Sequence, residues 1–519
     1  MIRLRRPILF ALLTLALLLC TACQRSDSQP QPTVQLTALQ YELENQAVDF
    51  NDMWFYRQLE EETGVHVDFE EVKDADWATR VSLMFASGNY HDMVLRGFLD
   101  TEDYGVTQGL LLPLEDYLEE HMPNYFSRLN MDGAGDAIPS SDGHSYYVGF
   151  LLSQNINTDG HFFINRNWLD KLGLDVPTTI DELTEVLRAF KTRDPNGNGL
   201  NDEVPYQATF DDCNTGIYNT FAHWGIPMND QYIFIGDHNQ VHFAPEEDGF
   251  RECLEWLHLL CSEGLLDVEC ITQGSNLWGA KVNNDTAGYF SYWRLGNTVL
   301  SDSIASQFEC ILPVSAQGRQ AKLCRLDDVV EFGAALTRQN KDTYASLRWL
   351  DAQFETENML VAQNGPLNDT LRLREDGRYE VVYVPEANDL YERVPVICGQ
   401  FFAPDDYYES IYMPAPHRLE KSAYSEIYEN AGVLEDKSYR ILTYVITKTS
   451  NESARLLQLH TQIKTLLDSA LVNFMIYGVT DENYSAFITS LEDAGSAEYK
   501  AIYQTAYDRH LAKMEGTHP

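Results

Sequence analysis

The 519-residue sequence lacks the short motifs that mark many enzymes and metal fingers. It contains no G-x-S-x-G, no H-E-x-x-H, no phosphate-binding P-loop and, after residue 23, no C-x-x-C pair. Basic residues are scarce as well, because 37 Lys and Arg stand against 79 Asp and Glu, a formal net charge of -42. So acidic a surface repels phosphates, which excludes a nucleic-acid partner and binding of the folded body to anionic lipid.

The sequence also lacks an apolar run long enough to span a bilayer. The longest run, Ile8 to Leu19, falls well short of the ~20 residues that a membrane-spanning helix needs. It follows the basic stretch MIRLRRP and precedes small residues, which is typical of a secretory signal. The stretch LCTAC resembles a bacterial lipobox, with Cys20 at the usual Leu position, and the resemblance implies lipidation of Cys23. An ordinary cleaved signal is the alternative.

We therefore expect residues 1–22 to be a lipoprotein signal peptide and 23–35, which are polar and contain proline, to be a flexible tether. Seven cysteines remain besides Cys20 and Cys23. Cys253 and Cys261 share one face of a predicted helix but lie ~12 Å apart, which is too far for a disulfide. We expect most cysteines to be buried and to pack as small apolar residues. One disulfide between other cysteines is the alternative.

Hydrophobic periodicity predicts an α/β fold. Strand and helix patterns alternate as β-α-β-α-β over residues 33–98, which indicates a parallel sheet with right-handed crossovers. Thr179 and Glu182 have capping-box spacing before an apolar stripe that runs from Ile180 to Phe190. The tail from Arg455 is predicted to be mostly helical.

The stretch DPNGNGLNDEVP, from Asp194 to Pro205, crowds oxygen-bearing side chains into a Gly-containing loop. Calcium takes 6–8 oxygens at ~2.3–2.6 Å, and glycine lets such a loop turn sharply. The spacing follows an EF-hand at first, but Pro205 stands where the closing Glu belongs, so Glu203 would close the shell instead. The predicted structural Ca²⁺ ligands are Asp194, Asn196, Asn198, the Leu200 carbonyl, Asp202 and Glu203. The alternative is an ordinary Asx- and Gly-rich surface turn.

Several stretches together resemble one family. The block FFINRNWLDKLGLDVPTTIDELTEVLRAFKTRDPNGNGLNDEVPY is similar to the extracellular solute-binding proteins of bacterial ABC importers, in particular the lipoprotein-type sugar binders. WATRVSLMFASGNYHDMV, with His91 in place of the usual Pro, and GLLLPLEDYLEEHMPN also resemble that family, as do LHLLCSEGLLDVE and LRWLDAQF. In some members the same loop binds calcium.

The resemblance implies a two-lobed, periplasmic-binding-protein-like (type II) α/β fold. Each lobe would be a mostly parallel sheet flanked by helices, hinged around a ligand cleft. We expect lobe one to hold residues 33–148 and about 310–365, and lobe two to hold 150–305 and about 370–519.

Aromatic planes cover the apolar faces of sugar rings, and polar side chains bind their hydroxyls. Ligands in open α/β sheets sit beyond the carboxyl ends of strands. The expected ligand-binding residues are therefore aromatic or polar residues near such ends, and for each a place in the core is the alternative: Tyr292, Trp293, Arg294, Tyr146, Tyr147, Trp224, Trp278 and Glu331.

These features predict a lipid-anchored, monomeric solute-binding component of an ABC importer that captures a sugar or oligosaccharide and delivers it to permease subunits. A peptide or other polar solute is the alternative ligand, and ligand sensing without transport is the alternative role. We expect no enzymatic activity, because paired carboxylates arise by chance in so acidic a chain and therefore do not indicate a glycosidase.

Overall fold

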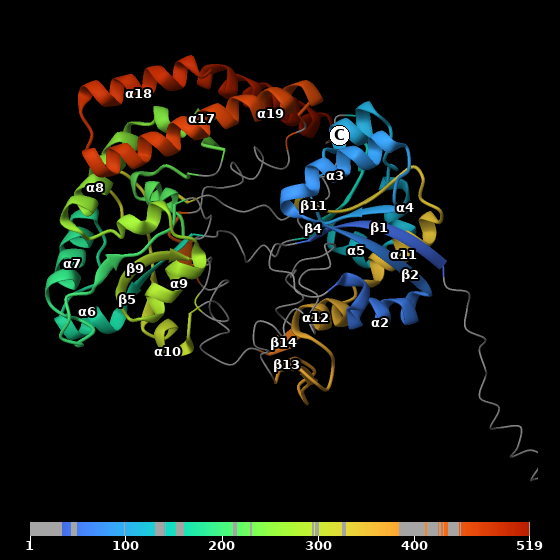
Figure 1. Ribbon diagram of the computed structural model, residues 1–519, viewed down its shortest axis with the longest axis horizontal. Coiled ribbons are helices and arrows are strands. Elements are labelled where there is room, and N and C mark those ends of the chain that lie inside the picture. The colour runs from blue at the N-terminus through green and yellow to red at the C-terminus, as the bar shows by residue number, and fades with distance from the viewer. Residues whose placement is uncertain are drawn as a thin grey trace, which may run out of the picture.

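The computed structural model describes residues 34–42, 49–97, 99–129, 140, 142–151, 160–210, 215–228, 231–292, 295, 300–323, 329–382, 410–412, 424, 427–428, 430–433, 446 and 448–517. Its elements gather into two lobes, each built on a sheet of its own (Figure 1). Each lobe has its own large cluster of buried hydrophobic side chains. The α/β two-lobed class is thus as predicted.

The first lobe begins with the predicted β-α-β-α-β unit. Its sheet has the order β2-β1-β3-β11-β4, and β1 pairs in parallel with both β2 and β3. Strand β11 enters antiparallel between β3 and β4. The bounds are β1 Val34–Glu42, α2 Trp54–Thr63, β2 Val65–Lys73, α3 Asp74–Ser87, β3 Met93–Leu95, β4 Val148–Leu151 and β11 Val329–Leu336.

Four further helices complete the first lobe: α4 Glu115–His121, α5 Pro123–Leu129, α11 Thr343–Ala352 and α12 Thr356–Asn364. A buried carboxylate ties two of them together, since Asp351 in α11 accepts a hydrogen bond of 3.0 Å from the backbone N–H of Tyr125 in α5. The core beneath these helices includes Phe55, Met93 and Trp349.

The second sheet is not mostly parallel, which corrects the sequence expectation. Its order is β10-β5-β9-β6, and of the three strand pairs only β6–β9 is parallel, because β5 runs against the other three strands. The reason is the direction of entry: β5 follows directly on the crossing from the first lobe and starts at the edge where β9 and β10 end. The bounds are β5 His161–Asn165, β6 Val204–Tyr206, β9 Ala287–Tyr292 and β10 Phe308–Ile311.

Helices pack on both faces of this sheet: α6 Arg166–Leu172, α7 Ile180–Thr192, α8 Asp248–Glu263, α9 Ser275–Asn283 and α10 Asp302–Ala305, with the 3-10 segment η4 Ile217–Trp224. The predicted capping box of Thr179 and Glu182 is confirmed, and the apolar stripe of α7 is buried. The hairpin of β7 (Ile233–Ile235) and β8 (Val241–Phe243) lies beside them.

The chain changes lobes at different places from those expected. Val314, Ala316 and Leu323 are buried in the second core, so the return to the first lobe comes after residue 323 rather than near 310. Leu371 and Ile411 are buried in the first core, so the first lobe continues past residue 370. They belong to a small sheet of β12 Leu371–Leu373, β13 Tyr379–Val381 and β14 Ile411–Tyr412.

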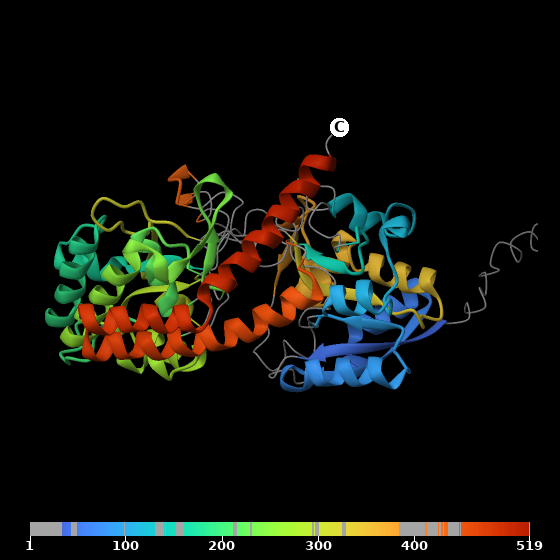
Figure 2. The same cartoon turned by 90° about the horizontal axis from the view of Figure 1, so that it is seen from above.

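The predicted helical tail forms α17 Ser450–Tyr477, α18 Asp481–Asp493 and α19 Ser496–Thr517. The 28 residues of α17 give a length of ~42 Å, and the helix contacts both α8 and the first lobe's η2 (Glu102–Thr107). Figure 2 shows α17 and α19 extending from the second lobe toward the first. None of the described helices is long and apolar enough to span a membrane.

Four cysteines lie in described parts of the second lobe, and all four are free thiols. Cys253 and Cys270 are buried, as expected for small apolar residues, whereas Cys261 and Cys310 are partly buried. Burial raises the pKa of the Cys261 thiol to about 11, so it stays protonated at neutral pH.

Candidate functional site

In each sheet the carboxyl ends of all strands but one lie at the edge where the chain passes between the lobes, and the exceptions are β11 and β5. In the first sheet β1, β2, β3 and β4 all run toward the edge at which Leu151 ends β4. In the second sheet Tyr292 ends β9 opposite His161, the first residue of β5. Because ligands of open α/β sheets bind beyond carboxyl ends, these two edges form the candidate ligand site.

The second lobe's edge carries buried carboxamides. Gln207 follows β6 directly and donates its backbone N–H to the Tyr289 carbonyl at 3.0 Å. Its side chain is 1% exposed, and within the described part of the chain neither amide atom has a hydrogen-bond partner. Gln273 lies beside it, because its Nε2 donates to the Ala208 carbonyl at 2.6 Å.

Two aromatic residues predicted from the sequence lie at the same edge. Trp278 in α9 is fully buried and packs against Tyr292, with ring centroids 4.8 Å apart, and edge-on against Phe290 at 5.3 Å. Strand alternation places Tyr292, Phe290 and His161 on the face of the sheet that α9 covers. A second polar pair, Asn219 and Ser291, joins at 3.2 Å near the same edge.

The first lobe's edge is polar and strained. Arg96, directly after β3, is 8% exposed and has a φ of 68°, a left-handed conformation that non-glycine residues seldom adopt. Its N–H donates to the Gly333 carbonyl at 2.6 Å, which holds the turn in place. Gly97 follows, and a Cβ there would lie 2.0 Å from the Trp77 ring. Such strain tends to persist at ligand-binding sites.

A buried carboxamide also lies at this edge. Gln40, in the last part of β1, is fully buried, and its Nε2 donates to the Tyr41 carbonyl at 2.8 Å. Its Oε1 has no partner among the described residues. Gln40, Arg96 and Gln207 share one signal in the sequence, a polar residue at the end of a buried strand. The sequence expectation, which rested on aromatic residues, did not include them.

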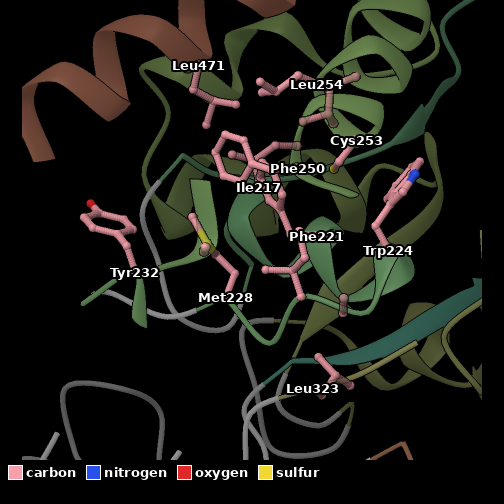
Figure 3. Close-up of a cluster of buried hydrophobic side chains, with 14 of the residues drawn as sticks. Ile217, Phe221, Trp224, Met228, Tyr232, Phe250, Cys253, Leu254, Leu323 and Leu471 are labelled. Carbon is pink, nitrogen blue, oxygen red and sulfur yellow. The ribbon is translucent and has the colours of Figure 1, made fainter. Parts of the chain in front are cut away.

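The other predicted ligand residues are placed as follows. Trp293 and Arg294 lie outside the described residues, and Glu331 lies in β11 with its side chain outside them. Tyr146 and Tyr147 are buried in the first core, where the Tyr146 hydroxyl donates to Asp142 at 2.7 Å. Trp224 is buried in the same second-lobe cluster as Phe221 and Cys253 (Figure 3), and its ring packs against Trp256 with centroids 5.5 Å apart.

The loop after α7 folds as a tight turn around its own oxygens. Asp194 has a φ of 44°, and its carboxylate accepts hydrogen bonds from the backbone N–H groups of Gly197 at 2.9 Å and Gly199 at 3.2 Å. Asn198 accepts from the Leu200 N–H at 2.7 Å and turns its amide nitrogen toward Asp202. The side-chain oxygens predicted to bind calcium therefore come from one compact loop.

Glu203 is the unusual member of this loop. It is 1% exposed, and its Oε1 has no hydrogen-bond partner among the described residues. Burial, followed by the negative charges of Asp202 and Asp194, raises the pKa of this carboxyl above its ordinary value. A buried carboxylate oxygen without a partner is costly, and a cation bound to that oxygen would remove the cost. This donor set of carboxylates and amides suits a hard cation such as Ca²⁺.

The acidic side chains do not by themselves form a closed metal cage. Across the described ranges, no group of at least three His, Cys, Asp or Glu is arranged to hold a metal ion. An ion in this loop would therefore need oxygens from Asn196, Asn198 and the Leu200 carbonyl as well.

Comparison with known proteins supports the family resemblance. A model of the bacterial extracellular solute-binding proteins matches residues 33–226, which run from the first sheet into the second lobe and include the loop. Over these residues the chain is similar to the bacterial extracellular solute-binding proteins, which confirms the resemblance inferred from the sequence motifs.

A curated relative matches nearly the whole chain. This chain is 24% identical to the fructooligosaccharide ABC transporter substrate-binding protein FusA of Streptococcus pneumoniae, over 96% of this chain and 97% of FusA. It is 27% identical to lipoprotein LipO of Bacillus subtilis over 45% of each chain. FusA is a transporter's substrate-binding protein rather than an enzyme, which agrees with the prediction that this protein is not an enzyme.

Solved structures confirm the fold. FusA in complex with kestose superposes with a TM-score of 0.77 at 22% identity, over 92% of this chain and all of FusA, and an EF-hand mutant of FusA with fructo-nystose has also been solved. A solute-binding protein of Bifidobacterium longum infantis, described as binding human milk oligosaccharides (HMO), has a TM-score of 0.78 at 22% identity, over 92% of this chain and 99% of that one.

Proposed function

We propose that this protein captures an oligosaccharide outside the cell and delivers it to the permease subunits of an ABC importer. The observation that carries the proposal is the likeness to the fructooligosaccharide binder FusA, which takes in 96% of this chain and therefore both lobes. The buried polar groups at the carboxyl ends of strands in the two sheets support it, since sugar hydroxyls need such partners.

The ligand would bind between the lobes and favour the closed arrangement, because only there can it contact both edges. Gln40 and Arg96 would contribute from the first lobe, and Tyr292 and Trp278 from the second. Trp293 and Arg294, which follow β9, and Glu331 in β11 remain candidates for the same site. Tyr146 and Tyr147 are weaker candidates because they precede β4 and so lie at its amino end, and Trp224 is weaker because it packs against Trp256 in the second core.

We also propose that the mature protein begins at a lipidated Cys23 and stays at the outer face of the membrane. The lipobox-like stretch LCTAC and the polar tether 23–35 support this, as does the similarity to a protein named as a lipoprotein. Two or three acyl chains would hold the protein stably, whereas a single chain would not.

We further propose that the loop of Asp194 to Glu203 holds a structural calcium ion. Asp194, Asn196, Asn198, Asp202 and Glu203 would supply side-chain oxygens, and Leu200 its carbonyl. Bound calcium would neutralise the buried Glu203 and stabilise the junction of α7 and β6. The unpartnered Glu203 oxygen and the EF-hand of FusA both support the ion.

Calorimetric titration of the protein lacking its signal tests the ligand proposal. The panel holds kestose, nystose, an alginate oligosaccharide and a tripeptide, all measured in calcium. We expect saturable binding of at least one saccharide and none of the peptide. Binding of the tripeptide alone would assign the protein to peptide capture instead.

A further inference from the structure

Three neutral, buried side chains at the second lobe's edge leave polar atoms without partners. Gln207, Gln273 and Trp278 are 1%, 6% and 0% exposed. In the described structure both amide atoms of Gln207, the Oε1 of Gln273 and the Nε1 of Trp278 make no hydrogen bond. Each buried polar group without a partner destabilises the folded state, so four such atoms in one place indicate a partner from outside the protein.

The contacts of the backbone bring these three residues to one place. Gln207 extends the β6–β9 ladder by one hydrogen bond, to Tyr289. Because Tyr206 faces the second core, strand alternation turns Gln207 to the opposite face, where Trp278 packs on Phe290. The side chain of Gln273 donates to the carbonyl of Ala208, the residue after Gln207, and Gln273 lies two positions before the first residue of α9.

The chemistry of this group suits adjacent hydroxyls. A carboxamide presents an acceptor and a donor side by side, so it can accept from one hydroxyl of a vicinal pair and donate to the next. The second amide oxygen and the indole N–H add one more acceptor and one more donor. All three side chains are uncharged, and burying a ligand carboxylate against them would carry a large desolvation cost.

We propose that Gln207, Gln273 and Trp278 form a buried subsite that binds vicinal hydroxyls of an uncharged sugar unit. The inference rests on the proposed oligosaccharide-binding function and assigns it a ligand chemistry. It favours neutral saccharides over uronate-containing ones, and it makes Gln207 the residue with the largest contribution because both of its amide atoms await a partner.

The test is Gln207→Leu, with kestose and nystose as probes in calorimetric titration. We expect the affinity to fall roughly ten- to hundredfold through loss of two hydrogen bonds. The melting temperature of the ligand-free variant should stay the same or rise, because an unpaired amide has been replaced by an apolar side chain. If the branched Leu disturbs packing, Gln207→Met keeps the length and shape of the side chain and should show the same loss.

Gln353→Leu is the matched control. Gln353 is a fully buried carboxamide in the first lobe whose Nε2 donates to the Trp349 carbonyl and whose Oε1 is unpaired, as in Gln273. The affinity of the Gln353→Leu variant for kestose should equal that of the wild type. If the wild type binds and both Gln207 variants bind within twofold of it, the subsite is refuted while the proposed function stands. If the wild type binds neither kestose, nystose nor any other saccharide of the panel, both are refuted.

Discussion

Replacing Glu203 by Gln should reverse the order of stability between calcium and chelator. The Glu203 carboxyl is 1% exposed, its Oε1 has no partner in the described structure, and burial beside Asp202 and Asp194 raises its pKa. Without calcium, the variant removes a buried charge and keeps the shape of the side chain. We therefore expect Glu203→Gln to melt at or above the wild-type temperature in EGTA at pH 7.

With calcium the order should invert. An ion at 100 times its dissociation constant stabilises the folded state by about 2.7 kcal/mol. For a unit of 150–250 residues about 1 kcal/mol shifts the melting temperature by ~2–4 °C, so the wild type should gain roughly 5–10 °C. The variant should gain much less, since a neutral amide is a poorer ligand for a hard cation.

The pH dependence gives an independent check on the same residue. The folded-state pKa of Glu203 lies above its unfolded value. In EGTA this residue therefore favours the folded state most at low pH, and its contribution to stability is lost as pH rises past 4.5. Calcium requires the ionised carboxylate, so the stabilisation by calcium should grow over the same interval. Glu203→Gln should show neither effect.

The assay is differential scanning fluorimetry in 1 mM calcium (about a hundredfold excess if the site is of sensor affinity) or in EGTA. Asp376→Asn is the control, because Asp376 also lies in an acidic Gly-containing turn but bonds Arg378 at 2.8 Å. It should leave the response to calcium intact. The reasoning fails if wild type melts equally in calcium and EGTA, or if Glu203→Gln gains as much from calcium as wild type does.

Two further predictions concern buried groups outside the ligand site. Burial, reinforced by Asp49, raises the pKa of Glu71 to about 8, so the first lobe should lose stability as pH rises from 4.5 to 8. Glu71→Gln should reduce this loss of stability in melting curves recorded over that pH range. A wild type whose melting temperature does not fall over that range would refute the prediction. The Tyr428 hydroxyl accepts from the Phe162 N–H at 2.9 Å and donates to the Ile311 carbonyl at 2.7 Å. Tyr428→Phe should therefore cost about 2–4 kcal/mol in urea unfolding, and a loss under 0.5 kcal/mol, the scale of an ordinary surface substitution, would contradict it.

How much of the candidate site could be read from the sequence differs between its two parts. The loop at Asp194 is local: its oxygens lie within ten residues of one another, and their spacing along the chain fixes their spacing in the fold. The ligand edge is assembled from Gln207, Gln273 and Trp278, which come from separate elements, so no window of sequence contains it. The expectation that aromatic residues line the site included Trp278 and Tyr292. The sequence does not reveal that Gln207 is buried with unpaired amide atoms, because that depends on its neighbours in the fold.

The sequence by itself determined the local structure and the family. Periodicity gave the β-α-β-α-β unit of the first lobe, Thr179 and Glu182 gave the start of α7, and the block 161–205 identified the family, because each depends on residues within a few turns of the chain. Only the tertiary structure decided the rest. It set β5 antiparallel to β9, sent the chain back to the first lobe after residue 323 and placed Leu371 in the first core, because strand direction and lobe membership depend on contacts between distant segments, which compete for the same buried surface.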